Sequence, residues 1–258
     1  MEQNRKPLIH LITNYVTVND VVNVVLASGA TAICADSPRE SAQITSLADA
    51  LVLNIGTPSD QRVEAMLRSG KAANEKGIPV LLDPVGLGAS DYRMEIVQKL
   101  LSTIHFSCIR GNISEIAALY DHTSVVPGSA GVEASGSRIS LQCAAELAAR
   151  LDTILVITSD TDYVVSADRV ATCTEGTPLL TKITGSGCML DAYLGACFAG
   201  KGGTDPMDLF DSALQAVQAY GQAAVTAEQK ALGTASFRME LIDEISRLSG
   251  TFTGGTGV

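Results

Sequence analysis

Short apolar segments rich in Val, Ile and Leu alternate with longer segments whose apolar residues recur at helical spacing, over most of this 258-residue chain. The first kind predicts buried strands at residues 7–13, 31–35, 50–55, 79–82, 106–109 and 153–158. The second kind predicts helices at residues 18–28, 40–47, 59–76, 91–102, 140–151, 206–230 and 239–248, and one after Asn112. This alternation favours an α/β fold, with a mostly parallel sheet and helices on both faces.

The segments after residue 158 are shorter and separated by turns. Residues 162–166, 169–174 and 178–181 predict antiparallel strands added at one edge of the sheet. The Gly/Ser-rich residues 126–136 are expected to form a mobile loop or lid, and the tail 251–258 is expected to fray. Since neither a linker nor an internal repeat divides the chain, we expect residues 1–258 to form a single domain.

The composition argues against several classes of function. A formal net charge of −10, with no basic run, speaks against a nucleic-acid-binding surface. The N-terminus lacks an apolar signal core and no apolar run is long enough to span a membrane, which predicts a cytoplasmic protein without a membrane partner. The six cysteines form no C-x-x-C pair and the three histidines form no ligand pattern, so neither a zinc site nor a disulfide framework is expected.

One stretch joins an apparent strand, L-L-T-K-I-T at residues 179–184, through the turn G-S-G at 185–187 to a helix beginning at Cys188. The free N–H groups and the dipole of such a helix N-terminus suit an anion, above all a phosphate. The stretch lacks the Lys-Ser or Lys-Thr pair of a Walker loop, and Leu190 replaces the third glycine of a dinucleotide fingerprint. We interpret the turn as holding a transferring phosphoryl group, with Cys188 where the accepting hydroxyl arrives. A small cysteine buried at a helix start is the alternative.

Polar side chains follow the predicted parallel strands at the edge where ligands of such sheets bind. They are Asn14, Asp36, Asn54, Asp83, Arg110 and Asn112. Each alone could be a turn or cap residue, but their shared position favours a common site.

Two carboxylates near a phosphate site indicate a magnesium ion held largely through water, and Asp83 and Glu115 are the candidates. Glu115 could instead cap its own helix. Arg110 could clamp a phosphate with its fork of donors, or form a buried pair with Glu115. Thr158 ends its strand with a hydroxyl at the same edge.

Five motifs, in order and over nearly the whole chain, resemble the hydroxyethylthiazole kinase family of the ribokinase-like superfamily: I-T-N-Y-V-T-V-N, A-L-V-L-N-I-G-T, L-L-D-P-V-G-L-G-A, I-R-G-N-I-S-E-I and L-L-T-K-I-T-G-S-G-C. The resemblance implies a three-layer sandwich with short antiparallel strands at one edge. It also implies transfer of the γ-phosphate of ATP to the hydroxyl of 4-methyl-5-(2-hydroxyethyl)thiazole, a thiamine precursor, in a homotrimer with active sites at subunit boundaries.

The resemblance assigns the site residues of this sequence by motif. They are, for ATP, Arg110, Thr158, Asn112 and Gly187; for Mg²⁺, Asp83 and Glu115; for the thiazole, Cys34, Gly185 and Asn14; and, for catalysis, Cys188.

Three positions depart from related patterns. Cys34 stands where relatives commonly carry Met, which predicts a looser thiazole pocket, and Ser159 replaces a glycine in T-S-D-T-D. Cys188 stands where other ribokinase-like kinases carry an Asp that serves as the base. A helix N-terminus lowers a thiol pKa, so partial thiolate is expected. Because phosphoryl transfer needs little early deprotonation of the nucleophile, we expect Cys188 to assist the reaction rather than to be indispensable.

Two other readings stay open from the sequence. One is a ribokinase-like kinase for another small alcohol. The other is a catalytically silent ligand-binding relative, favoured by the lack of Asp at position 188 and opposed by the presence of Asp83, Glu115, Arg110 and the glycine turn.

Overall fold

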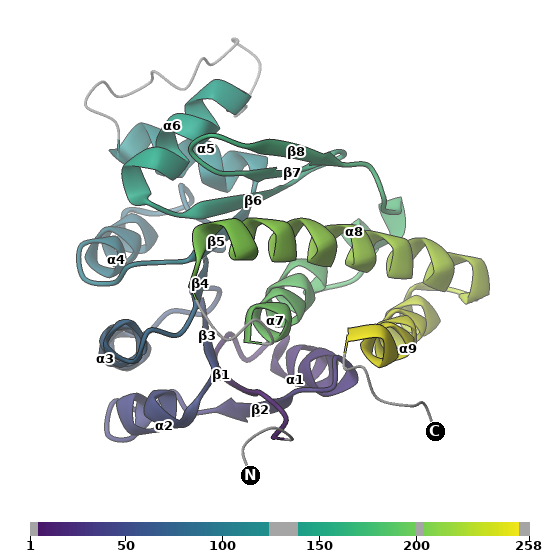
Figure 1. Ribbon diagram of the computed structural model, residues 1–258, viewed down its shortest axis with the longest axis horizontal. Coiled ribbons are helices and arrows are strands. Elements are labelled where there is room, and N and C mark those ends of the chain that lie inside the picture. The colour runs from purple at the N-terminus through teal and green to yellow at the C-terminus, as the bar shows by residue number, and fades with distance from the viewer. Residues whose placement is uncertain (1–4, 124–138, 200–203, 253–258) are drawn as a thin grey trace.

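The computed structural model describes residues 5–123, 139–199 and 204–252, and an eight-stranded sheet forms its middle layer (Figure 1). The strands lie in the order β2-β1-β3-β4-β5-β6-β7-β8. Those from β2 to β6 are parallel, whereas β7 and β8 pair antiparallel at one edge. Their bounds are β1 Leu8–Ile12, β2 Thr31–Cys34, β3 Ala50–Asn54, β4 Val80–Asp83, β5 Cys108–Asn112, β6 Ile154–Thr158, β7 Asp162–Val165 and β8 Val170–Cys173.

Helices cover both faces of the sheet (Figure 1). On one face lie α1 Val18–Ala27, α7 Ser186–Ala199, α8 Pro206–Lys230 and α9 Thr234–Phe252. On the other face lie α2 Ser41–Leu47, α3 Asp60–Lys76, α4 Asp91–Leu101, α5 Ile113–Thr123 and α6 Leu141–Leu151. This arrangement is the predicted three-layer α/β sandwich.

The central strand β3 shows why the sheet is covered on both sides. All five of its residues are buried. Because successive side chains point to opposite faces, Val52 joins the apolar core under α1 and α7, while Leu51 and Leu53 join the core under α3 and α4. An apolar, uninterrupted strand of this kind is stable only between two layers of helices.

Most elements match the sequence-based prediction to within a few residues, although α9 begins earlier, at Thr234. The strand predicted at residues 179–184, and with it the edge strand at 178–181, is wrong. Pro178–Lys182 is a 3₁₀ helix that starts at a proline, with the Thr177 hydroxyl accepting a hydrogen bond from the Leu179 N–H. Pro and a hydroxyl cap favour a helical turn over the extended pairing that the β-branched residues suggested.

The predicted loop at 126–136 and the last six residues of the predicted tail lie outside the described residues. The single-domain assignment of residues 1–258 stays a prediction. Across the ranges that the structure describes, no helix combines the length and the apolar character needed to cross a membrane.

Candidate active site

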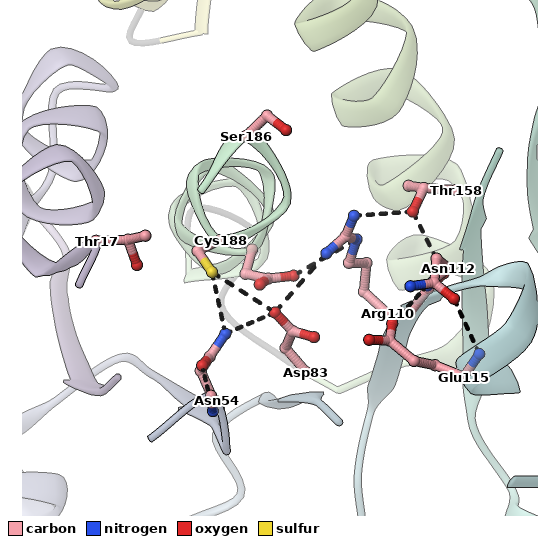
Figure 2. A network of polar contacts seen from close by, with 12 residues as sticks. Thr17, Asn54, Asp83, Arg110, Asn112, Glu115, Thr158, Ser186 and Cys188 are labelled. Carbon is pink, nitrogen blue, oxygen red and sulfur yellow. Dashed lines mark hydrogen bonds and ion pairs between the residues drawn. The ribbon is translucent and has the colours of Figure 1, made fainter. Parts of the chain in front are cut away.

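The site lies at the carboxyl ends of the parallel strands, at the point where the order in which the chain adds strands reverses. The chain passes from β1 outward to β2 and then back to β3, on the other side of β1. Crevices of α/β sheets open at such a point. Here Asn14, just after β1, donates a hydrogen bond from Nδ2 to Oδ1 of Asn54 at the end of β3, over 3.0 Å. The N-terminus of α7 faces this pair (Figure 2).

Cys188, in the first turn of α7, is held by polar groups from three strand ends (Figure 2). Its Sγ accepts N–H groups from Asn14 at 3.4 Å and from Asn54 at 3.3 Å, and it lies 3.9 Å from Asp83 Oδ2. Burial and the charge of Asp83 raise the pKa of this thiol, against hydrogen bonds from Thr17 and Asn14 and the charge of Arg110. This direction is opposite to the lowering expected at a helix N-terminus, and burial is its largest cause.

Two glycines let other groups approach the start of α7 closely. Gly185 has φ +83°, and a Cβ there would lie 2.4 Å from Thr17 Cγ2. A Cβ on Gly187 would lie 2.2 Å from Nη1 of Arg110. The Tyr220 hydroxyl, on α8, donates a 2.7 Å hydrogen bond to the Ser186 carbonyl and so ties the first turn of α7 to α8. The helix N-terminus is thus fixed against Arg110.

Arg110 projects from β5 toward this N-terminus with only 12% of its side chain exposed. It donates a 2.8 Å hydrogen bond from Nη2 to Thr158 Oγ1 on the neighbouring strand β6. Its ion-pair partners are Asp83 at 3.7 Å and Asp191 at 4.0 Å. Burial acts to lower the pKa of Arg110, but the charges of Asp191, Asp83 and Glu115 together hold that pKa above its ordinary value. The side chain stays cationic, as a phosphate ligand must.

Glu115 has the capping role that was the alternative to metal binding. Asn112 Oδ1 accepts the N–H groups of Ser114 and Glu115, and Glu115 Oε2 accepts the N–H of Asn112 at 2.8 Å, a reciprocal capping box. Glu115 Oε1 accepts the N–H of Gly86 at 2.7 Å and so fixes the turn after β4. Glu115 is not hydrogen-bonded to Arg110, whose direct partners are other residues.

Asp83 and Glu115 are the candidate ligands of a magnesium ion. Asp83 is 1% exposed; its Oδ2 accepts a hydrogen bond from Asn54, whereas its Oδ1 has no partner. A buried carboxylate oxygen without a donor suits a hard cation. Each Glu115 oxygen already accepts one N–H but keeps a second lone pair, which suits contact through water. The residues present fit the ion.

A cavity of about 1170 Å³ opens beside Arg110 and brings together the four residues predicted to contact ATP: Arg110, Asn112, Thr158 and Gly187. Ser159 also lines it, and its N–H bonds to the Asp162 carboxylate over 2.9 Å.

Cys34 is separate from the large cavity and lines a second one of about 110 Å³, with Thr13, Tyr15 and Asp36 among its neighbours. The predicted thiazole residues are therefore divided. Asn14 and Gly185 lie at the N-terminus of α7, whereas Cys34 is the last residue of β2.

Asp191 is one of two site residues that sequence reasoning missed. It lies one turn after Cys188 on α7, is 1% exposed, and pairs with Arg110. An acidic residue within an otherwise apolar helix was the available signal, because such a residue is rarely buried without a partner. Arg93 was missed as well. It donates hydrogen bonds to the carbonyls of Ile55, Gly56 and Val85, which fixes the loops after β3 and β4.

The sequence profile of the hydroxyethylthiazole kinase family matches residues 2–251. The chain belongs to the hydroxyethylthiazole kinase family. A hydroxyethylthiazole kinase from Desulforudis audaxviator is 47% identical over 244 residues, covering 95% of this chain and 87% of that protein. The hydroxyethylthiazole kinase of Clostridium beijerinckii is 42% identical over 252 residues, covering 96% and 90%.

Solved structures confirm the fold expected for the hydroxyethylthiazole kinase family. A hydroxyethylthiazole kinase protein from Pyrococcus horikoshii OT3 superposes with a TM-score of 0.80 at 33% identity, covering 97% of this chain and 92% of that one. A ribokinase-like superfamily protein from Enterococcus faecalis superposes with a TM-score of 0.64 at 10% identity, covering 93% and 86%. The predicted ribokinase-like sandwich is confirmed.

Proposed function

We propose that this chain transfers the γ-phosphoryl group of ATP to the hydroxyl of 4-methyl-5-(2-hydroxyethyl)thiazole, in thiamine biosynthesis or salvage. The observation that carries the proposal is the fixed N-terminus of α7, with Gly187 against Arg110 at the edge of the large cavity and Cys188 on the Asn14–Asn54 pair. This geometry offers an anion site beside a polar group that can meet an alcohol.

The large cavity takes the nucleotide in this proposal. Arg110 and the N–H groups that begin α7 contact the transferring phosphoryl group, with Thr158 holding the guanidinium in place. Asn112 and Gly187 line the same cavity. A cation and a helix N-terminus both stabilise the negative charge of a phosphoryl group, and they are most effective where water is excluded.

In this proposal Asp83 and Glu115 would hold Mg²⁺, Glu115 through water, and the bound ion would supply further neutralisation of phosphate charge. The chain's own residues then act by position. Asn14 and Asn54 hold Cys188, and the neutral thiol orients the acceptor hydroxyl. The acceptor oxygen bonds to the γ-phosphorus as the bond to ADP breaks, and the hydroxyl proton passes late to a transferred phosphoryl oxygen and from there to solvent, so no strong base is needed.

The thiazole lies on the side of Asn14, Gly185 and Cys34 in this proposal. Cys34 is exposed and lines the small cavity, and its short side chain would fill less of that pocket than a Met side chain. We further propose a cytoplasmic homotrimer, in which a neighbouring subunit would cover the exposed side of this pocket, where Tyr15 is 70% exposed.

A coupled assay of ADP release with Mg·ATP and the thiazole alcohol tests the function. Turnover with this alcohol well above that with pyrimidine and pyridoxal-type alcohols is the expected result. If another alcohol is preferred, that alcohol is the substrate in place of the thiazole alcohol. Binding of the thiazole alcohol and Mg·ATP in calorimetry, without turnover, would indicate a catalytically silent relative. Sedimentation equilibrium tests the trimer separately.

A further inference from the structure

Three potential metal ligands from two elements lie close together at the N-terminal end of α7. They are Asp83 at the end of β4 and Cys188 and Asp191 on α7, and one ligand atom from each lies within 4.8 Å of the others. Asp83 and Asp191 are each 1% exposed. Asp83 Oδ1 and both carboxylate oxygens of Asp191 have no hydrogen-bond partner. Buried oxygens of this kind are costly unless a donor or a cation satisfies them.

With both carboxyl groups ionised, the charges around these oxygens do not balance. Among the residues that the structure describes, Arg110 alone forms an ion pair with either carboxylate, at 3.7 Å from Asp83 and 4.0 Å from Asp191. Neither distance is that of a hydrogen bond. Two buried carboxylates therefore face one guanidinium. If Cys188 joins them as a thiolate, a divalent cation together with Arg110 makes the group neutral.

The amide groups that donate hydrogen bonds to these ligands suit a metal-bound thiolate. Asn14 and Asn54 both direct amide N–H groups at Cys188 Sγ, at 3.4 and 3.3 Å. Asn54 also donates to Asp83 Oδ2 over 2.6 Å. Hydrogen bonds to the side chains that coordinate a metal orient those side chains and stabilise their charge. A set of one sulfur and two carboxylate oxygens selects Zn²⁺ or Co²⁺ over Mg²⁺, which prefers oxygen and water.

We propose that Asp83, Cys188 and Asp191 bind a borderline-soft divalent ion of the Zn²⁺ and Co²⁺ class, and that this ion inhibits phosphoryl transfer. The binding stands on the cluster alone, whereas the inhibition rests on the proposed function, since the ion would occupy Asp83 and Cys188 together. No zinc pattern is visible in the sequence because the ligands come from β4 and α7, which are more than 100 residues apart. Binding displaces the thiol proton into solvent.

Titration of metal-free protein with Co²⁺ tests the binding by absorbance. The expected result is a sulfur-to-cobalt charge-transfer band that saturates at one ion per chain. Cys188→Ser should abolish the band, and Asp191→Asn should weaken Co²⁺ affinity at least 10-fold. Cys143→Ser, which changes a partly exposed thiol on the opposite helical layer, should leave the band unchanged. Lack of a band in the wild type, or its persistence in Cys188→Ser, would overturn the proposal.

Inhibition is measured separately, with Zn²⁺ added to the coupled assay at saturating Mg·ATP. Zn²⁺ should inhibit the wild type reversibly, with recovery on chelation, and the residual activity of Cys188→Ser should be at least 10-fold less sensitive. Equal sensitivity in both proteins would overturn the inhibitory role. If the wild type shows the cobalt band but no kinase activity, the proposed function fails and the metal site stands. Should Asp191→Asn not fold, the Cys188→Ser result still decides.

Discussion

Asn54 donates a hydrogen bond from its side-chain amide to Asp83 Oδ2 over 2.6 Å, between residues that are paired neighbours at the ends of β3 and β4. Its Oδ1 accepts N–H groups from Gly56 and Asn14, which fixes the orientation of the amide. The Nδ2 group consequently faces both Asp83 and Cys188. One amide thus couples the candidate metal ligand to the candidate catalytic thiol.

Replacement of this amide tests that coupling. Asn54→Ala should lower kcat about 10- to 100-fold, because Asp83 and Cys188 lose a shared donor, and should destabilise the fold by about 1–3 kcal/mol. Steady-state kinetics and urea unfolding measure the two effects. Asn74→Ala, which removes the hydrogen bonds of Asn74 to the His105 backbone, is the matched control and should lower stability only. Unchanged kcat in Asn54→Ala would contradict the assigned role.

Gly187→Ala should impair the phosphate site directly. Its new Cβ would lie 2.2 Å from Arg110 Nη1, so the guanidinium must move. We expect kcat/KM for ATP to fall about 100-fold, a loss typical of misplaced groups in an active site. Gly233→Ala, where no atom lies within 4 Å of the added Cβ, serves as control. Wild-type kinetics for Gly187→Ala would show that Arg110 does not act from its observed position.

Arg110→Lys retains the charge and removes the planar fork. The hydrogen bond to Thr158 Oγ1 and the contact with Asp83 cannot both be made by one ammonium in the same geometry. The expected result is a fall in kcat of about 10- to 100-fold with a smaller change in the KM for the thiazole. Thr158→Val should show a weaker form of the same defect. A larger fall in kcat for Thr158→Val than for Arg110→Lys would argue against Arg110 as the phosphate ligand.

Cys188→Ala should slow turnover by about 10- to 100-fold, below the upper part of the range for general bases. The reason is that burial and Asp83 raise the pKa of the thiol, so it is protonated near neutral pH and orients the acceptor rather than ionising first. Measurements of kcat across pH check this. The value of kcat should not increase as a larger fraction of the Cys188 thiol is deprotonated. A loss well beyond 10⁴-fold would identify an indispensable base.

His10 should make stability depend on pH. The ring is fully buried on β1, contacts Thr45 Oγ1 and the Ala35 carbonyl, and has its pKa lowered by burial from 6.5. The unfolded chain therefore binds a proton first as pH falls, so this residue destabilises the fold below about pH 6.5, by up to about 1.4 kcal/mol per pH unit.

His10→Gln removes that titration, and the difference in unfolding free energy between wild type and variant should change between pH 7 and pH 5. Urea unfolding at several pH values measures it, and His105→Gln, at an exposed histidine, provides the comparison. If the wild type and His10→Gln lose stability in parallel on acidification, His10 is not the group responsible.

The sequence alone determined the layers of this protein and the edge of the sheet that carries its site. Periodic burial of apolar residues and glycine or proline breaks are local, so strands such as Ala50–Asn54 and helices such as Asp60–Lys76 could be predicted from neighbouring residues. Parallel strands bring their carboxyl ends together, which is why Asn14, Asp83, Arg110 and Asn112 could be assigned to one edge.

Tertiary structure decided what the local pattern could not. The β-branched residues before the glycine turn suggested a strand, yet Pro178 and Thr177 start a 3₁₀ helix there. Asp191 became a partner of Arg110 only when α7 packed against β1, β3 and β4. Burial and the charge of Asp83 raise the pKa of the Cys188 thiol, which the local helix start could not indicate. Partner choice and desolvation depend on residues distant in the sequence, since both follow from which surfaces the folded chain brings into contact.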